Sequence, residues 1–153
     1  MQPLNIKVKK LPHFDPALPL PGYETPGAAG ADLRACLEGK ADLVIKPGDR
    51  VLVPSGLVFE IPPGFEMQVR PRSGVSYKTG LMVLNSPGTI DSDYRGELKI
   101  ILGNLGKSNE IIRHGDRIAQ IVIAPIMQAS FLSADSLSQT TRGDGGLGST
   151  GKN

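Results

Sequence analysis

The chain has 153 residues, which is enough for one domain that buries a core without disulfide or metal cross-links. The formal net charge is only +2 and the lysines and arginines are scattered, which argues against a nucleic-acid-binding surface. No apolar run is long enough to cross a membrane, and the single cysteine, Cys36, excludes an internal disulfide. We therefore expect a cytoplasmic protein that binds neither membranes nor nucleic acid, with Cys36 as a small buried side chain.

Short apolar or alternating segments recur along the chain and predict β-strands. They lie at residues 5–9, 43–45, 50–53, 57–61, 65–69, 81–84, 98–102, 110–112 and 117–123. The 19 glycines and 13 prolines fall mostly between these segments, as expected for many turns. One short helix is expected at Ser73–Lys78, after Pro71. Many short strands at this spacing indicate an all-β barrel or sandwich.

The composition changes at Ser133. Residues 133–153 are rich in Gly, Ser and Thr, and their only large apolar residues are Leu137 and Leu147. Such a segment cannot bury enough apolar surface to order itself. We therefore expect a β domain over residues 1–132 and a flexible C-terminal arm over residues 133–153.

Two glycine motifs in the arm resemble nucleotide-binding loops. Gly143–Gly148 matches G-x-G-x-x-G, and Gly146–Asn153 is one residue short of a phosphate-binding P-loop. Both motifs act between a strand and a helix, and neither element is expected here, so these two folds are not indicated. Exposed glycine N–H groups beside Arg142, Ser149 and Thr150 can still wrap anionic oxygens. The arm thus fits either a lid over a phosphate ligand or a disordered tail.

The most chemically varied segment is Asn85–Glu97, read as NSPGTIDSDYRGE. It joins two apolar runs, which predicts a β-hairpin with an elaborated tip. Asp91 can act as a general base toward water, and Asn85 offers the donor and acceptor that a nucleobase edge requires. Tyr94 presents a flat face suited to a sugar ring. Because function concentrates on loops held by a scaffold, this tip is the leading candidate site.

Other polar segments have both a functional and a structural interpretation. Asp32 lies among small residues that permit close backbone approach, or in a plain turn. Arg72-Ser73-Gly74 offers a guanidinium, a hydroxyl and an amide that suit an oxyanion, or forms a surface turn.

Strict alternation along residues 117–123 places Gln120 on the same face as Ile118 and Val122, where its amide needs a partner. His13 and His114 lack a second ligand at metal-binding spacing. We therefore expect surface histidines and no direct protein cage for a metal.

Five segments, in this order, resemble the homotrimeric dUTP pyrophosphatases (dUTPases). They are AGADLRA at 29–35, PRSG at 71–74, NSPGTIDSDYRGE at 85–97, GDRIAQIVIAP at 115–125 and RGDGGLGSTG at 142–151. The resemblance implies a jelly-roll-like β fold and a homotrimer whose active sites are shared, with the arm closing over nucleotide from a neighbour. It also implies hydrolysis of dUTP to dUMP and pyrophosphate, with Mg²⁺ on the triphosphate.

The resemblance also implies roles for individual residues. Asp91 resembles the base that activates the attacking water, and Tyr94 resembles the floor beneath deoxyribose, where a ribose 2′-hydroxyl would clash. Asn85, with backbone groups at Thr89, Ile90 and Asp91 and near Lys99, resembles the reader of the uracil edge.

The remaining implied roles concern the phosphates and the arm. The phosphate contacts are Arg72, Ser73, Gly74 and Gln120, while Asp32 reaches Mg²⁺ only through water. The arm's grip on the outer phosphates is Arg142, Gly148, Ser149 and Thr150. Leu147 stands where the family usually has an aromatic residue stacked on uracil, so it can cover the ring but lacks the favourable π geometry.

Two alternatives remain open from the sequence. A related, zinc-free dCTP deaminase shares the scaffold, whereas zinc deaminases are excluded because their ligand motifs are missing. A catalytically silent trimeric nucleotide-binding protein is the second alternative, although Asp91, Arg72 and the polar residues of the arm are all present.

Overall fold

The structure, a computed structural model, describes residues 4–146. The strands are β1 (Lys7–Lys10), β2 (Ala31–Arg34), β3 (Leu43–Ile45), β4 (Arg50–Pro54), β5 (Leu57–Glu60), β6 (Phe65–Arg70), β7 (Leu81–Val83), β8 (Gly88–Ile90), β9 (Lys99–Asn104), β10 (Glu110–Ile112) and β11 (Arg117–Pro125). Helix α1 spans Ser73–Lys78 and a 3₁₀ turn, η1, spans Glu38–Lys40. The all-β prediction and the short helix are confirmed, and the predicted strands end within two residues of the observed ones.

Two strands were not predicted, β2 and β8. β2 (ADLR) is only four residues long and carries one large apolar side chain, Leu33. β8 (GTI) lies inside the polar hairpin tip and is three residues long. Both form because partner strands supply their hydrogen bonds, which local sequence does not reveal.

All strand pairings are antiparallel. One sheet has the order β2-β11-β6-β8 and another the order β4-β9-β7, while β1 pairs with β5 and β3 with β10. The buried core takes side chains from both larger sheets, such as Met67 and Ile121 from the first and Ile100 and Leu102 from the second. Cys36 is fully buried in this core, as predicted.

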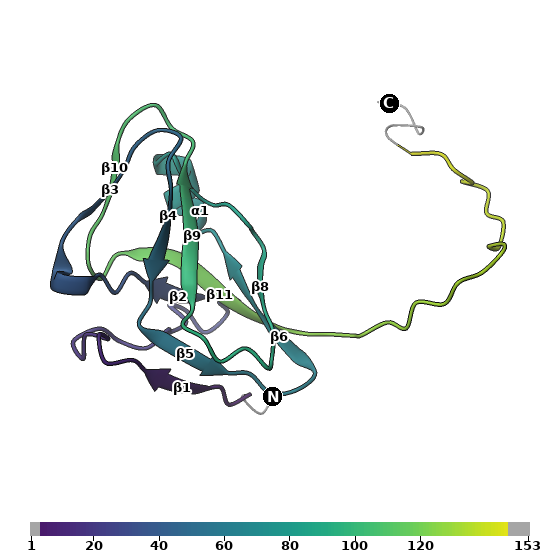
Figure 1. The fold of residues 1–153 in the computed structure, drawn as a ribbon, viewed down its shortest axis with the longest axis horizontal. Helices are drawn as coiled ribbons and strands as arrows, with labels where there is room; N and C mark the ends of the chain where they lie inside the picture. The colour runs from purple at the N-terminus through teal and green to yellow at the C-terminus, as the bar shows by residue number, and fades with distance from the viewer. Residues whose placement is uncertain (1–3, 147–153) are drawn as a thin grey trace.

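The predicted hairpin forms, since β7 pairs with β9 and Val83 lies opposite Leu102. Its tip is not a free loop. β8 leaves that sheet and pairs with β6 in the four-stranded sheet, with Thr89 opposite Gln68. The chain therefore passes from the three-stranded sheet to the four-stranded sheet after β7 and returns with β9, so hydrogen bonds to both sheets hold this segment (Figure 1).

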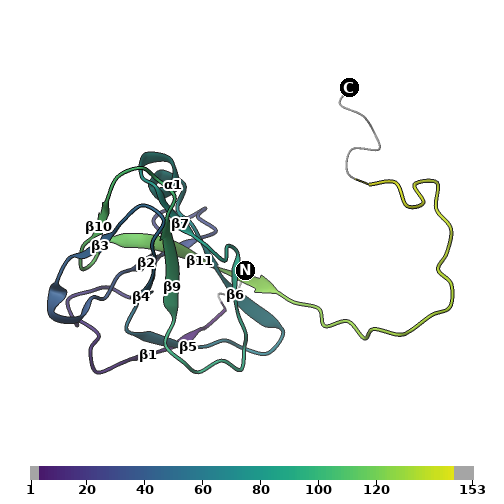
Figure 2. The same cartoon turned by 45° about the horizontal axis from the view of Figure 1, so that its top comes forward.

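The chain extends away from the body after β11, as Figures 1 and 2 both show. Residues 126–146 form neither helix nor strand, and all but Gly145 are exposed. Met127 and Phe131 are each 95% exposed. Within residues 4–146, no helix is long and apolar enough to cross a membrane.

Asn104 is a fully buried polar residue at the end of β9. Its Nδ2 donates to the backbone carbonyls of Ile45 and Ser108, both at 2.8 Å, and its Oδ1 accepts from the Gly106 N–H at 2.9 Å. A Cβ on Gly80 would lie 2.4 Å from that Oδ1, so only glycine fits beside it. One side chain thus joins β3, β9 and the loop after β9.

We predict that Asn104→Ala lowers the free energy of unfolding by about 2–3 kcal/mol, because buried backbone groups lose their partners. Urea unfolding followed by circular dichroism measures this loss. Asn109→Ala is the matched control, since Asn109 is exposed in the same loop and should change stability by less than about 0.5 kcal/mol. Equal effects of the two substitutions would show that the Asn104 hydrogen bonds contribute little.

Candidate active site

The hairpin tip lines a cavity of about 430 Å³. Its walls are Leu52, Asn85, Thr89, Ile90, Asp91, Tyr94, Glu97, Lys99 and Ile101. Every residue that the sequence analysis assigned to base, sugar and water recognition is among them. The structure therefore brings the predicted tip residues together around one space, which we call the tip pocket.

Two glycines in the tip lack a Cβ and so leave room for the Asn85 amide and the Tyr94 ring. A Cβ on Gly88, in β8, would lie 2.8 Å from Nδ2 of Asn85, and a Cβ on Gly96 would lie 2.2 Å from the hydroxyl oxygen of Tyr94. The Asn85 amide and the Tyr94 ring therefore pack directly over glycine backbone. The Tyr94 hydroxyl also donates to the Glu97 carbonyl at 3.1 Å, which holds the ring against the chain.

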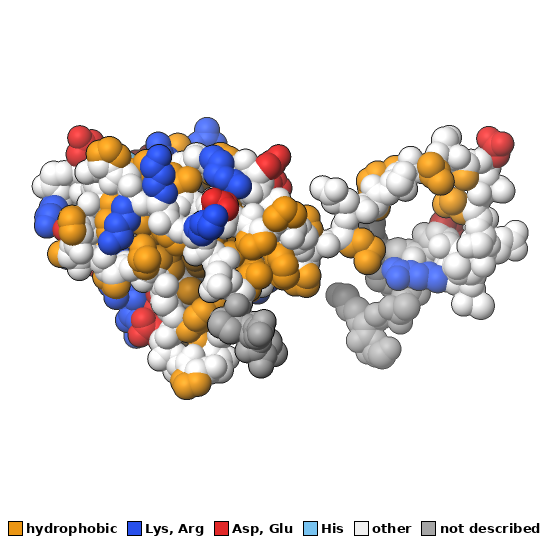
Figure 3. Space-filling view, turned by 90° about the horizontal axis from the view of Figure 1, so that it is seen from below, with side chains coloured by type: hydrophobic (Ala, Val, Ile, Leu, Met, Phe, Trp, Pro, Cys, Tyr) orange, Lys and Arg blue, Asp and Glu red, His pale blue; other side chains and the backbone are white. Residues whose placement is uncertain are grey.

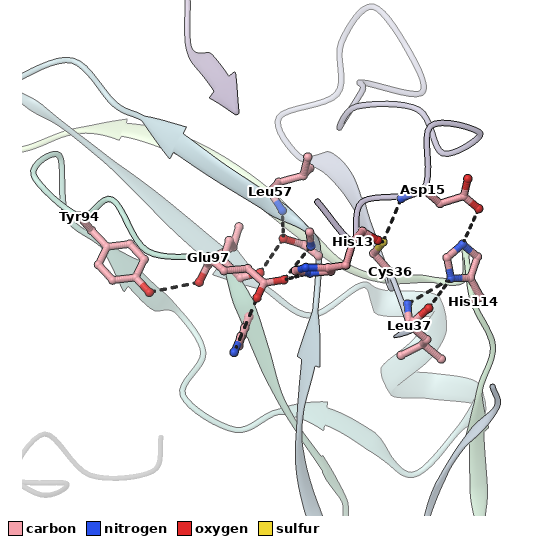
Figure 4. A network of polar contacts seen from close by, with 12 residues as sticks. His13, Asp15, Cys36, Leu37, Leu57, Tyr94, Glu97 and His114 are labelled. Atoms are coloured by element: carbon pink, nitrogen blue, oxygen red, sulfur yellow. Dashed lines mark hydrogen bonds and ion pairs between the residues drawn. The ribbon is translucent and has the colours of Figure 1, made fainter. Parts of the chain in front are cut away.

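Glu97 is a pocket residue that the sequence analysis missed. Its side chain is 12% exposed and its Oε1 lies 2.8 Å from the Gly56 nitrogen and 3.0 Å from Nε2 of His13. Its Oε2 lies 3.6 Å from Nζ of Lys99. Figure 4 shows His13 reaching this carboxylate beside Tyr94. The partners of Glu97 come from residues 41 and 84 positions away, so no local pattern signals the role.

A second polar cluster surrounds Asp32 on β2. Its Oδ1 accepts from Nε of Arg72 at 2.8 Å and its Oδ2 from Nη1 of Arg117 at 3.0 Å. Arg72 also donates to the Arg117 carbonyl at 3.1 Å. The Asp32 side chain is 11% exposed, so the two guanidinium groups balance a nearly buried charge. Arg117 was not predicted to belong to this site.

Gln120 joins the Asp32 cluster, and its amide has the partner that the sequence required. Its Nε2 donates to the Pro71 carbonyl at 2.9 Å, and its amide packs so closely on Gly30 that a Cβ there would lie 2.1 Å from Oε1. The prediction that Gln120 shares a face with Ile118 is wrong. The register of β11 shifts between Arg117 and Ala119, so Ile118 packs into the core while Gln120 does not.

Ser73 and Gly74 open helix α1 directly after Arg72, and both are exposed. The first backbone N–H groups of a helix lack partners within the helix, so this end offers donors next to the Arg72 guanidinium. Segments 29–35, 71–74 and 115–120 thus meet in one cluster of basic and amide groups.

The tip pocket and the Asp32 cluster occupy opposite edges of one sheet. In the order β2-β11-β6-β8, Asp32 lies on the first strand and Thr89 and Ile90 on the last. Three strand spacings separate them, which is about 14 Å along the sheet. Within one chain the predicted phosphate residues therefore do not line the tip pocket.

Of the two histidines predicted to be surface residues, His13 is exposed and His114 is not. His114 is not a surface residue, since its side chain is 12% exposed, its Nε2 lies 3.0 Å from Oδ2 of Asp15 and its Nδ1 lies 3.1 Å from the Leu37 backbone. Lys40 hydrogen-bonds the same carboxylate and, with Ala17 N–H, lowers the pKa of Asp15 to about 2. This cluster joins the turn around Asp15 to η1 and to the loop that carries His114.

The predicted arm residues lie apart from both clusters or outside the described residues. Arg142 is exposed and donates from Nε to the Gly145 carbonyl at 2.8 Å, within the arm itself. Leu147, Gly148, Ser149 and Thr150 lie outside the described residues. Across residues 4–146, no group of three or more His, Cys, Asp or Glu side chains is placed to hold a metal ion.

The chain is similar to known proteins over most of its length. A family model described as dUTPase matches residues 17–151. A Rhizobium etli (strain CIAT 652) protein named deoxyuridine 5'-triphosphate nucleotidohydrolase is 59% identical over 134 residues, 88% of this chain and 86% of that protein. A protein of the same name from Roseobacter denitrificans is 54% identical over 149 residues, 97% of both. A dUTPase structure from Staphylococcus bacteriophage 80alpha with dUpNHpp has a TM-score of 0.80 and 25% identity, covering 96% of this chain and 98% of that chain.

We predict that Asp32→Asn lowers the free energy of unfolding by about 1.5–3 kcal/mol, because it removes the negative charge between Arg72 and Arg117. Glu24→Gln is the control, since Glu24 also pairs with Arg117, at 3.3 Å, but is 60% exposed. That exposed pair should contribute less than about 1 kcal/mol. Urea denaturation of both variants measures the difference, and similar values for the two would contradict the importance assigned to Asp32.

Proposed function

The chain belongs to the dUTPase family, and on that premise we propose that it hydrolyses dUTP to dUMP and pyrophosphate. The observation that carries the proposal is the tip pocket, where an amide, an aromatic ring and a carboxylate line one cavity. Those three groups match the three needs of the reaction: reading a base, testing a sugar and activating a water.

The nucleoside would occupy the tip pocket. Asn85 offers both a donor and an acceptor to the uracil edge, together with backbone groups at Thr89 and Ile90 in β8. The Asn85 amide packs on the backbone of Gly88, which supports it from one side. Tyr94 supports the deoxyribose with its ring, and a 2′-hydroxyl would meet that ring.

Asp91 would act as the general base. It follows β8 directly, and its carbonyl accepts the Tyr94 N–H at 3.2 Å, so Asp91 and Tyr94 belong to one turn. The carboxylate takes a proton from water as the water attacks the α-phosphorus, and the bond to the pyrophosphate oxygen breaks. Positioning and charge stabilisation supply most of the remaining rate enhancement in phosphoryl transfer.

The triphosphate would contact the Asp32 cluster. Asp32 engages Nε of Arg72 and leaves other guanidinium donors for phosphate oxygens, next to Ser73 and Gly74 at the start of α1. Gln120 adds a side-chain amide. Mg²⁺ bound to the triphosphate would offset its charge. Asp32 suits contact through a metal-bound water, because an arginine already occupies each of its oxygens.

The active site would be completed by neighbouring chains in a homotrimer. The tip pocket and the Asp32 cluster lie at opposite edges of one sheet, so we assign the two halves of each active site to different subunits. Figure 3 shows hydrophobic side chains where the arm leaves the body, and Ile126 and Met127 are exposed there. We assign this surface to subunit contact and the segment 133–153, with Arg142, Leu147, Gly148, Ser149 and Thr150, to the lid over the nucleotide.

The activity is tested with a substrate panel of dUTP, dTTP, UTP and dCTP in the presence of Mg²⁺. We expect pyrophosphate release from dUTP at a rate at least about 100-fold above the other three, since one missing hydrogen bond or one clash in the pocket has effects of this size. Ammonia release from dCTP would instead support the deaminase alternative. No turnover of any nucleotide, with dUTP still bound, would support the silent binding protein.

We predict that Asp91→Asn lowers kcat for dUTP by roughly 100-fold or more while leaving the dissociation constant for dUTP within about threefold, because the amide cannot accept the proton from water. Single-turnover rates and calorimetric titration measure the two quantities. Asp93→Asn is the control, because Asp93 belongs to the same tip but does not line the pocket. Near-normal turnover in Asp91→Asn would remove Asp91 as the base.

We further predict that two inactive variants restore activity when they assemble together. Asp91→Asn damages the tip pocket and Arg72→Gln damages the Asp32 cluster, so a mixed trimer contains some sites with both halves intact. Co-expressed, differently tagged chains purified through both tags should show at least about a tenth of wild-type activity. If the mixed assemblies stay as inactive as each parent, the shared-site proposal is wrong.

A further inference from the structure

His13 lies far from the tip in sequence but is fixed beside it by the core. Phe14 is 6% exposed and packs on Gly56, whose φ of +69° and lack of a Cβ allow the contact. The buried Cys36 thiol donates to the His13 carbonyl at 3.4 Å. These contacts hold the His13 backbone in place, and its imidazole, 36% exposed, extends from there to Glu97.

The imidazole meets Glu97 at a point where three segments converge. Nε2 of His13 and the N–H of Gly56 both point to Oε1 of Glu97, at 3.0 and 2.8 Å. The residues around Gly56 and Glu97 are also joined, since the Ser55 hydroxyl donates to the Leu98 carbonyl at 2.6 Å. Glu97 is therefore anchored through its side chain as well as its backbone (Figure 4).

The anchored Glu97 in turn holds Tyr94. The Tyr94 hydroxyl donates to the Glu97 carbonyl at 3.1 Å, and the ring lies over Gly96, where no side chain supports it from below. Tyr94 is 46% exposed, so packing alone does not fix its ring. Among the described residues, the Tyr94 side chain makes no other hydrogen bond than this one to the Glu97 carbonyl.

We propose that His13 is a specificity-determining residue: through Glu97 it positions the Tyr94 ring and thereby sets the discrimination between deoxyribo- and ribonucleotides. The inference rests on the proposed placement of the sugar on Tyr94. A ring tied at its hydroxyl cannot tilt away from a 2′-hydroxyl, whereas an untied ring can. Loss of the hydrogen bond from the Tyr94 hydroxyl to the Glu97 carbonyl, which we call the Tyr94 tie, therefore improves UTP hydrolysis relative to dUTP hydrolysis. Asp91 and Asn85 keep their places.

The test compares kcat/KM for dUTP and UTP in the assembled enzyme. In His13→Ala, we expect the dUTP/UTP ratio to fall by roughly five- to tenfold, the effect of losing about one hydrogen bond. His13→Gln should restore most of the ratio, because its amide can donate to Glu97. Tyr94→Phe keeps the ring and removes the tie, so it should lower the ratio by a similar factor.

The double variant His13→Ala/Tyr94→Phe provides the sharpest readout. If His13 acts through the Tyr94 tie, the double variant should show no further fall beyond the single variants. A multiplied effect, or an unchanged ratio in folded His13→Ala and Tyr94→Phe, would overturn the inference. Should His13→Ala fail to assemble, His13→Phe takes its place, because it keeps a ring but cannot donate to Glu97: the dUTP/UTP ratio should fall, and an unchanged ratio would overturn the inference.

His114→Ala is the matched histidine control. It removes the contact to Asp15, away from the tip pocket, so it should lower stability without changing the dUTP/UTP ratio. A ratio that falls equally in this control would assign the effect to general loosening of the N-terminal segment and reject the specific role of His13. Failure of the wild-type enzyme to hydrolyse dUTP would reject the proposed function instead, which keeps the two failures distinguishable.

Discussion

The pairing of β8 with β6 is the constraint on which the tip pocket depends. β7 and β9, on either side of β8 in the chain, belong to another sheet. The three residues of β8 are therefore the part of this segment that pairs with the four-stranded sheet. Their hydrogen bonds fix where Asp91 and Tyr94 emerge from the strand end. Catalytic groups need placement within fractions of an ångström, and a loop tied to two sheets meets that need better than a free hairpin turn.

Charge balance organises the Asp32 cluster. Asp32 is nearly buried, and it is stable there because Arg72 and Arg117 each bind one of its oxygens. The same ion pairs orient the Arg72 guanidinium before any ligand arrives. A preorganised cation loses less side-chain entropy on binding an anion than a mobile lysine would.

The sequence predicted what depends on local pattern and missed what depends on distant partners. Apolar runs such as Leu57–Ile61 identify strands because half-buried pleated surfaces select Val, Ile and Leu. Ile118 was placed on the face of Gln120 but packs in the core, since a bulge in β11 shifts the alternation. Glu97, Arg117 and His114 gained their roles from contacts across 41 to 99 residues, which no spacing rule encodes. The family resemblance supplied the grouping of segments, but not these supports.

The distance between the two clusters has a consequence for how catalysis responds to dilution. If no chain holds a complete site, the active species is the assembly, and its amount follows the mass-action equilibrium between chains and trimer. Specific activity would then fall as the enzyme is diluted below the dissociation concentration, even though each β domain stays folded. Nucleotide bound across a subunit boundary would oppose that fall, so the substrate would itself strengthen the assembly that consumes it.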